Sequence, residues 1–326
     1  MRSHTPVLVG AMLAAWASGI ASSSYAGNYP VKPIKVVVPL AAGSTADVRA
    51  RQISEHLSKA LGWQVIVENR PGAGNTLGAD YVAKSAPDGY TLLYGTIADQ
   101  SIAPALYPNL PYNPRRDFAP ITQNALVPAI LFVNAELGVR SMQELIALAK
   151  AKPAQLTFGS YGNGTLTHLL LAQLNRETGI EITHVPYKSA AAALTDVVAG
   201  RVSLLFDFVI TAGPFVKAGK LRPLMIVGAK RSRVFPDVPS AAEVGLPRIS
   251  HNAWAGFLAP AGTPRDIVNR LNTELVRIVR SPEFAQIAVD SGGEAVGNSP
   301  EEFAAFIRSE QDELAGLVKA TGARVD

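Results

Sequence analysis

Few residues in this chain are able to do chemistry, and their spacing excludes the common catalytic and metal sites. No GxSxG nucleophile elbow and no GxxxxGK[ST] phosphate loop occurs. His168 follows Thr165 by three residues, which on a helix favours a pocket-lining role over a nucleophile–base pair. No two histidines have the spacing of the HExxH zinc motif, and no carboxylate cluster accompanies them, so we predict no metal site. The five histidines lie at positions 4, 56, 168, 184 and 251.

Two loops of small residues combine the features of an anion-binding site. One is Leu40–Asp47, after the apolar run 34–38, and the other is Ser160–His168, after the run 156–159. Each lies between a predicted strand and the start of a predicted helix, where backbone N–H groups are free and the helix dipole favours anions. Neither loop contains arginine, so backbone N–H groups, hydroxyls and ordered water would be the donors. Two ordinary strand–helix turns are the alternative to loops facing each other across a cleft.

The elements that must position these loops alternate along the whole chain. Short apolar runs predict strands, and apolar stripes with capping residues predict helices between them. Ser141 and Glu144 have the spacing of a capping box at the start of a helix. Thr263 before Pro264 predicts a helix N-cap, and Ser299 before Pro300 predicts another. This order indicates mostly parallel sheets covered by helices on both faces. The predicted strands are 34–38, 64–68, 90–95, 129–133, 156–159, 182–186, 204–206 and 222–227.

Composition narrows the class of protein. The chain has 326 residues, of which 48% are hydrophobic and 17% charged, which suits two folded domains. The net charge is only +4, with no cluster of Lys or Arg, so we expect no nucleic-acid partner. The absence of cysteine excludes disulfides, thiolate metal sites and thiol nucleophiles.

The N-terminal segment has the pattern of an export signal. Arg2 precedes an apolar stretch over residues 6–20, and Ser24-Tyr25-Ala26 supplies the small residues that a signal peptidase reads. A membrane anchor is the alternative, but the serines at 22–24 interrupt the run before it reaches the roughly 20 apolar residues a span needs. We predict cleavage after Ala26 and export to the bacterial periplasm, a location that also suits a cysteine-free chain.

Several long segments carry a family resemblance. They resemble, in order, the extracytoplasmic solute receptors of tripartite tricarboxylate transporters, also called Bug proteins, over essentially all of residues 29–326. The segments are YPVKPIKVVVPLAAGSTADVRAR, VIVENRPGAGNTLGADYVAKSAPDGYTLLYG, LYPNLPYNPRRDFAPI, VPYKSAAAALTDVVAGRVSLLFD, AGKLRPL, FPDVPSAAEVGLP and WAGFLAPAGTP.

The resemblance implies an α/β, two-lobe, type II periplasmic-binding-protein fold with a hinge and an interlobe cleft. Lobe 1 would comprise residues 27–126 and 255–326, and lobe 2 residues 127–254. The implied function is non-catalytic: a monomer without a cofactor captures a small carboxylate and delivers it to membrane permease subunits. The carboxylate would be a di- or tricarboxylate, an aromatic acid or an acidic amino acid. Alternatives are a ligand-sensing subunit for a signalling partner and an exported α/β enzyme with an unrecognised site.

The resemblance also assigns ligand-binding positions. Leu40 stands where an aromatic residue is common in the family, Ser44 replaces a usual glycine and Ala103 an asparagine, which predicts a smaller, less stacking-prone wall. Asp207 would either contact a ligand ammonium group or only fix hydrogen bonds within its lobe. The assigned residues are Leu40, Ala41, Ala42, Gly43, Ser44, Asp47, Thr96, Ser160, Gly164, Thr165, His168 and Asp207.

Overall fold

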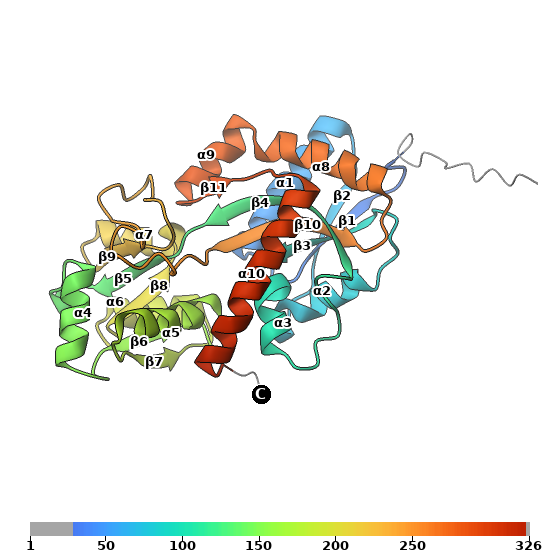
Figure 1. The fold of residues 1–326 in the computed structure, drawn as a ribbon. Helices are drawn as coiled ribbons and strands as arrows, with labels where there is room; N and C mark the ends of the chain where they lie inside the picture. The colour runs from blue at the N-terminus through green and yellow to red at the C-terminus, as the bar shows by residue number, and fades with distance from the viewer. Residues whose placement is uncertain (1–28, 324–326) are drawn as a thin grey trace, which may run out of the picture.

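A computed structural model describes residues 29–323 as two mixed sheets flanked by helices (Figure 1). We call the six-stranded sheet with its helices lobe 1 and the five-stranded sheet with its helices lobe 2. The predicted signal peptide, residues 1–26, lies outside the described residues, so its cleavage stays a prediction. Within the described range, every helix is too short or too polar to traverse a bilayer.

Lobe 1 is built around a sheet whose central strands, β3 and β10, are mostly buried. Its strand order is β11 (Glu294–Ala295), β4 (Phe118–Val127), β10 (Ala253–Pro260), β3 (Thr91–Thr96), β1 (Ile34–Val38) and β2 (Val65–Asn69). Its helices are α1 (Thr45–Leu61), α2 (Thr76–Ala83), α3 (Ala103–Leu106), α8 (Arg265–Val279), α9 (Pro282–Asp290) and α10 (Pro300–Thr321).

Lobe 2 has a smaller sheet of the same mixed kind. Its strand order is β7 (Thr183–Pro186), β6 (Thr157–Ser160), β8 (Leu204–Asp207), β5 (Ile130–Asn134) and β9 (Leu221–Ile226). Its helices are α4 (Met142–Ala151), α5 (Leu166–Thr178), α6 (Ala190–Val198) and α7 (Val209–Lys217).

The chain passes between the lobes twice, and α10 spans both. Only Pro128 and Ala129 separate β4 of one sheet from β5 of the other, and residues 227–252 lead from β9 back to β10. Helix α10 begins over the lobe 1 sheet and its far half packs against α5 of lobe 2 (Figure 1). A single apolar cluster therefore includes side chains of both lobes. We keep as a proposal the boundaries drawn from the sequence, 27–126 with 255–326 and 127–254.

Several sequence expectations need correction. The sheets are not mostly parallel: β1–β2, β1–β3, β6–β7 and β6–β8 are parallel, but β10 and β5 run antiparallel to both neighbours and β11 runs antiparallel to β4. The strands that cross between lobes cause this, because they run against the βα units beside them. Pro264, not Thr263, is the N-cap of α8, since the Thr263 hydroxyl donates to the Pro260 carbonyl at 2.8 Å. At α4 the Glu144 carboxylate accepts from the Arg140 N–H, so the capping box is only half formed.

Candidate functional site

The loop between β1 and α1 is held from within by Asp47. The hydroxyl of Ser44, the N-cap of α1, accepts the Asp47 N–H at 3.2 Å, and the Asp47 carboxylate accepts the Gly43 N–H at 2.8 Å. Gly43 has a φ of 81°, the left-handed region in which glycine is unstrained. The loop shape is therefore fixed at both sides of the helix start, where the first N–H groups have no partner within the helix.

The Asp47 carboxylate has no oxygen free for a ligand. It is 3% exposed, and its Oδ1 accepts from Arg51 Nε and Asn69 Nδ2, both at 2.9 Å. Burial would raise the pKa of this carboxyl, but the donors from Arg51, Gly43 and Asn69 lower it below its ordinary value. Asp47 therefore shapes the loop, while Ala41 and Ala42 are exposed and Leu40 beside them is half-buried.

The end of β3 is closed by Asp99, which the sequence did not single out. The Thr96 N–H and hydroxyl both donate to Asp99 Oδ1, at 2.9 and 2.6 Å. Gln100 Nε2 donates to the other carboxylate oxygen at 2.9 Å. Asp99 is fully buried in a π-helical turn, Ala98–Ile102, and desolvation raises its pKa to about 6 despite these donors. Thr96 is half-buried at the end of β3, and its hydroxyl proton is donated to the buried Asp99.

In lobe 2, the loop between β6 and α5 is built on two glycines. Gly162 and Gly164 have φ values of 122° and 73°. The Thr165 hydroxyl donates to the Gly162 carbonyl at 2.8 Å and lies 3.1 Å from the hydroxyl of Thr167. The Gly164 N–H donates to Nδ1 of His168 at 3.1 Å. Thr165 is thus the N-cap of α5, but its side chain caps no backbone N–H of the helix.

Ser160 is engaged by a histidine of lobe 2. It is fully buried, and its Oγ lies 2.5 Å from Nε2 of His184. The His184 ring stacks on that of His168. His184 was not predicted as part of the site. Its only sequence signal is its place one residue after β7 begins, 24 residues from its partner, and nothing local in the sequence links the two.

Asp207 fixes the start of α7 and also leaves one oxygen unused. Its Oδ1 accepts from the Phe208 N–H at 2.7 Å, the Thr211 hydroxyl at 2.6 Å and the Tyr161 hydroxyl. Oδ2 is buried and has no partner among the described residues. The side chain is 1% exposed, and burial raises its pKa. These three hydrogen bonds support the second of the two roles considered for Asp207, which is to fix hydrogen bonds within lobe 2.

Besides the packing of α10 on α5, two contacts between the lobes each place a side chain against a glycine. A Cβ added to Gly164 would lie 2.3 Å from a methyl of Leu106 in α3 of lobe 1. A Cβ added to Gly292 of lobe 1 would lie 2.3 Å from a methyl of Val209 at the start of α7. The lobe 2 ligand loop is therefore packed against lobe 1 through Leu106.

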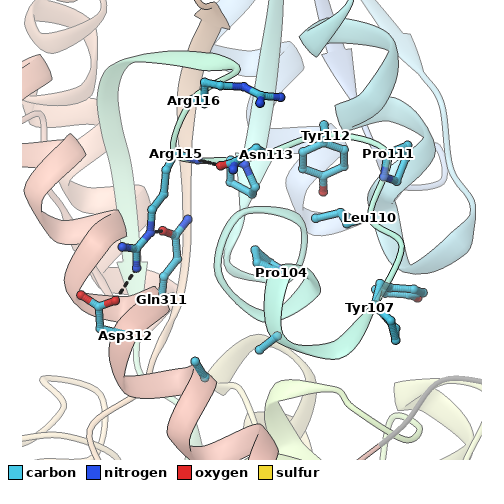
Figure 2. Close-up of a pocket in the computed structure, with 14 residues that line it drawn as sticks. Pro104, Tyr107, Leu110, Pro111, Tyr112, Asn113, Arg115, Arg116, Gln311 and Asp312 are labelled. Atoms are coloured by element: carbon cyan, nitrogen blue, oxygen red, sulfur yellow. Dashed lines mark hydrogen bonds and ion pairs between the residues drawn. The ribbon is translucent and has the colours of Figure 1, made fainter.

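A hollow on lobe 1, shown in Figure 2, does not have the chemistry of an anion site. It measures about 480 Å³ and lies between α10 and the loop after α3. None of its lining residues belongs to the predicted set. Its arginines are already engaged, Arg115 with Asp312 and with Gln311 at 2.6 Å, and Arg116 with Asp117 at 2.6 Å. The candidate site therefore remains the pair of loops at the starts of α1 and α5.

Comparison with known families decides what these loops belong to. Residues 49–323 match the family described as "Tripartite tricarboxylate transporter family receptor". The chain belongs to this receptor family. The resemblance drawn from the sequence is thereby confirmed, and so is the expectation that the chain is a receptor and not an enzyme, since its family and structural neighbours are solute-binding receptors.

Relatives support the assignment along nearly the whole receptor. This receptor is 35% identical to protein BugT of Bordetella pertussis (strain Tohama I) over 309 residues, which are 94% of this chain and 95% of BugT. It is 36% identical to the UPF0065 protein in the tcbD-tcbE intergenic region of Pseudomonas sp. (strain P51), covering 89% of this chain and 86% of that protein.

Solved structures confirm the two-lobe fold. An R. palustris protein with adipate is 34% identical, with a TM-score of 0.81, and the match covers 91% of this receptor and all of that chain. MatC from Rhodopseudomonas palustris with bound malate is 32% identical, with a TM-score of 0.76, covering 89% of this receptor and all of MatC. The receptor thus shares its architecture with proteins that were solved holding a dicarboxylate.

Proposed function

We propose that this receptor captures a small carboxylate in a cleft between the loops Ala41–Asp47 and Ser160–Thr165. It does so in the periplasm, as a monomer, after cleavage behind Ala26. It then delivers the carboxylate to the membrane permease subunits of a tripartite tricarboxylate-type transporter. The ligands of the two Rhodopseudomonas structures, adipate and malate, set the expected size and charge.

The observation that carries this proposal is the pairing of two helix starts with loops that lack cationic side chains. Helices α1 and α5 have 17 and 13 residues, long enough for a full N-terminal partial charge, and each follows a parallel strand. The lobe 1 loop is exposed at Ala41, Ala42 and Gly43, where nothing but backbone and methyl groups meets a ligand. Backbone N–H groups there suit an anion such as a carboxylate. No group of metal-ligating side chains occurs among the described residues.

A thermal-shift screen tests whether carboxylates bind at all. The mature protein is heated with adipate, malate, citrate, an aromatic acid and glutamate in turn. A ligand present at about 100 times its dissociation constant adds roughly 2.7 kcal/mol, a rise of several degrees for lobes of this size. A screen in which no carboxylate raises the melting temperature contradicts the proposal.

Charge variants test whether the two loops form the site. We expect Ala42→Glu and Asn163→Asp each to weaken binding of the screening hit by about 1–3 kcal/mol, because a carboxylate placed some 5 Å away repels the ligand. Both positions are exposed, so folding should be unaffected. Ala42→Gln is the matched neutral control, and native Asn163 serves that role in the second loop. Equal affinities for Ala42→Glu and Ala42→Gln place the site elsewhere.

The transport step is tested in cells that carry the receptor beside a pair of membrane-protein genes. Deleting the receptor should abolish uptake of the screening hit, and restoring the native chain should recover it. If uptake persists while purified receptor still binds the carboxylate, the partner is a sensor and not a permease.

A further inference from the structure

Two stacked histidines hold both ends of the lobe 2 ligand loop. The rings of His168 on α5 and His184 on β7 are 4.1 Å apart between centroids, with planes inclined by 4°. His168 Nδ1 accepts the N–H of Gly164, and His184 Nε2 is hydrogen-bonded to the hydroxyl of Ser160. The segment from Ser160 to Gly164 is thus attached to the stack at its first and its last residue.

We propose that His184, acting through His168, is a positioning residue for carboxylate capture and makes capture sensitive to acid. The inference rests on the proposed function, because it assumes that the loop from Ser160 to Thr165 binds the ligand. It adds a residue outside the predicted set and a pH dependence that the loops alone would not have.

The hydrogen-bond directions fix which protonation state holds the loop. Since the Gly164 N–H donates to Nδ1, that nitrogen carries no proton, and His168 is neutral with its proton on Nε2. A second proton would turn Nδ1 into a donor facing another donor, so the bond to Gly164 would be lost. Two protonated rings in a face-to-face stack would also repel each other. The neutral pair is therefore the form that orders the loop.

The surroundings of the pair favour this neutral form. Burial lowers the pKa of His168, and burial together with the charge of His168 lowers the pKa of His184 to about 4. The tyrosines that follow β6 and β7 are engaged elsewhere: the Tyr161 hydroxyl donates to Asp207, and the Tyr187 hydroxyl to Asp196 at 2.7 Å. Because the pKa of His168 is lower in the ordered loop, the loop is fully ordered above the ordinary histidine pKa of 6.5 and loses this order as the pH falls below that value.

Loss of the Gly164 bond reaches lobe 1 directly. Gly164 is buried against Leu106 of lobe 1. Its release removes an ordered N–H from the ligand loop and loosens this contact at the same time. Acid should therefore weaken binding through the loop itself, beyond any effect on the ligand.

Amide exchange of the loop tests the inference without a ligand. Protection of residues 160–165, corrected for intrinsic exchange rates, is compared at pH 7.0 and 5.0. We expect the native receptor to lose at least tenfold protection. His168→Asn, whose side-chain oxygen replaces Nδ1 as acceptor, should lose less than threefold. His184→Phe keeps the stack but leaves His168 able to take a proton, so its loss should lie between those of His168→Asn and the native chain because only one titrating ring remains. His56→Gln, on α1 beside Glu283 of α9, is the control and should follow the native chain. Acid-induced losses in both His168→Asn and His184→Phe that equal the loss of the native chain overturn the inference.

Calorimetry with malate or adipate then links the loop to binding. Between pH 7.0 and 5.5 the native receptor should bind at least fivefold more weakly. His168→Asn should show only the smaller change caused by protonation of the ligand itself. Parallel pH profiles for the two proteins refute the acid sensitivity of capture. If neither these two acids nor any other carboxylate of the thermal-shift screen binds, the proposed function fails, while the exchange experiment still decides whether the histidine pair orders the loop.

Discussion

At the scale of single residues, three buried aspartates shape the backbone around the candidate site. Asp47 accepts the N–H of Gly43, Asp99 that of Thr96, and Asp207 that of Phe208. Each lies close to the carboxyl end of a strand, where the chain turns toward a helix and its N–H groups lose their sheet partners. A buried carboxylate forms strong hydrogen bonds with such donors, but burying its charge costs free energy.

Asp99 should make the receptor less stable at neutral pH than at mild acid. Its pKa rises from 3.8 to about 6, so between these values the folded state binds more protons than the unfolded state, and stability falls as the pH rises. Asp99→Asn removes this term, and Gln100, whose Oε1 has no partner among the described residues, accepts the new amide after a flip.

Urea unfolding at pH 4 and pH 7 measures the effect. The stability of Asp99→Asn relative to the native chain should increase by about 2–3 kcal/mol between the two pH values. The same substitution at exposed Asp237 should give no such change. If the native chain and Asp99→Asn respond identically to pH, Asp99 is not charged and buried as described.

At the scale of elements, most apolar runs predicted their strands well, but β4, β10 and β11 were not predicted. Strand β1 matches its predicted bounds, and β6 is displaced by one residue. Strand β4 was missed because its middle reads Thr122-Gln123-Asn124, a polar run. These side chains are at most 3% exposed, and Asn298 bonds both the Thr122 hydroxyl and the Gln123 N–H. A partner 175 residues away gives no local signal.

The same limit applies to the candidate site. Both loops and their helix starts were predictable, since small residues after an apolar run are a local pattern. The inward roles of Asp47 and Ser160 were not, because their partners Asn69 and His184 lie 22 and 24 residues along the chain. The local sequence pattern indicated which segments form the candidate site. Only the packed structure shows that the side chains of Asp47 and Ser160 bond to other parts of their own lobe.

Helix α10 should depend on its N-cap more than on any exposed residue in its middle. Ser299 and Glu302 form a complete capping box, with the hydroxyl on the Glu302 N–H and the carboxylate on the Ser299 N–H. Ser299→Ala should cost about 1 kcal/mol and lower Tm by about 2–4 °C. Ser309→Ala, at an exposed mid-helix site, should change Tm by less than 1 °C or raise it. Equal losses from the two substitutions would show that the cap contributes nothing.

At the scale of the whole molecule, two crossing segments and α10 join the lobes, and two side chain-to-glycine contacts add to these joints. The crossing segments and α10 hold them together through a shared apolar cluster. Leu106 against Gly164 and Val209 against Gly292 are the side chain-to-glycine contacts that a hinge motion would separate. The sequence indicated two lobes, but it contains no pattern that pairs a valine with a glycine 83 residues later.

Gly292→Ala should therefore prevent full closure of the cleft. The added Cβ would lie 2.3 Å from Val209, at a backbone φ of 77° that already disfavours a side chain. Small-angle scattering with the screening hit measures closure, and we expect the ligand-induced decrease in radius of gyration to disappear in this variant. Affinity should fall in proportion to the lost fraction of closed receptor.

Two controls separate the clash from backbone strain. Gly138→Ala has the same strain, with a φ of 81°, but its Cβ meets no atom within 4 Å, so this variant should still close. Adding Val209→Ala to Gly292→Ala leaves the nearest remaining atom at 3.0 Å and should restore most of the compaction. Compaction that survives in Gly292→Ala alone would mean that ligand binding does not require the Val209–Gly292 contact, and that closure is set on the Leu106 side of the cleft.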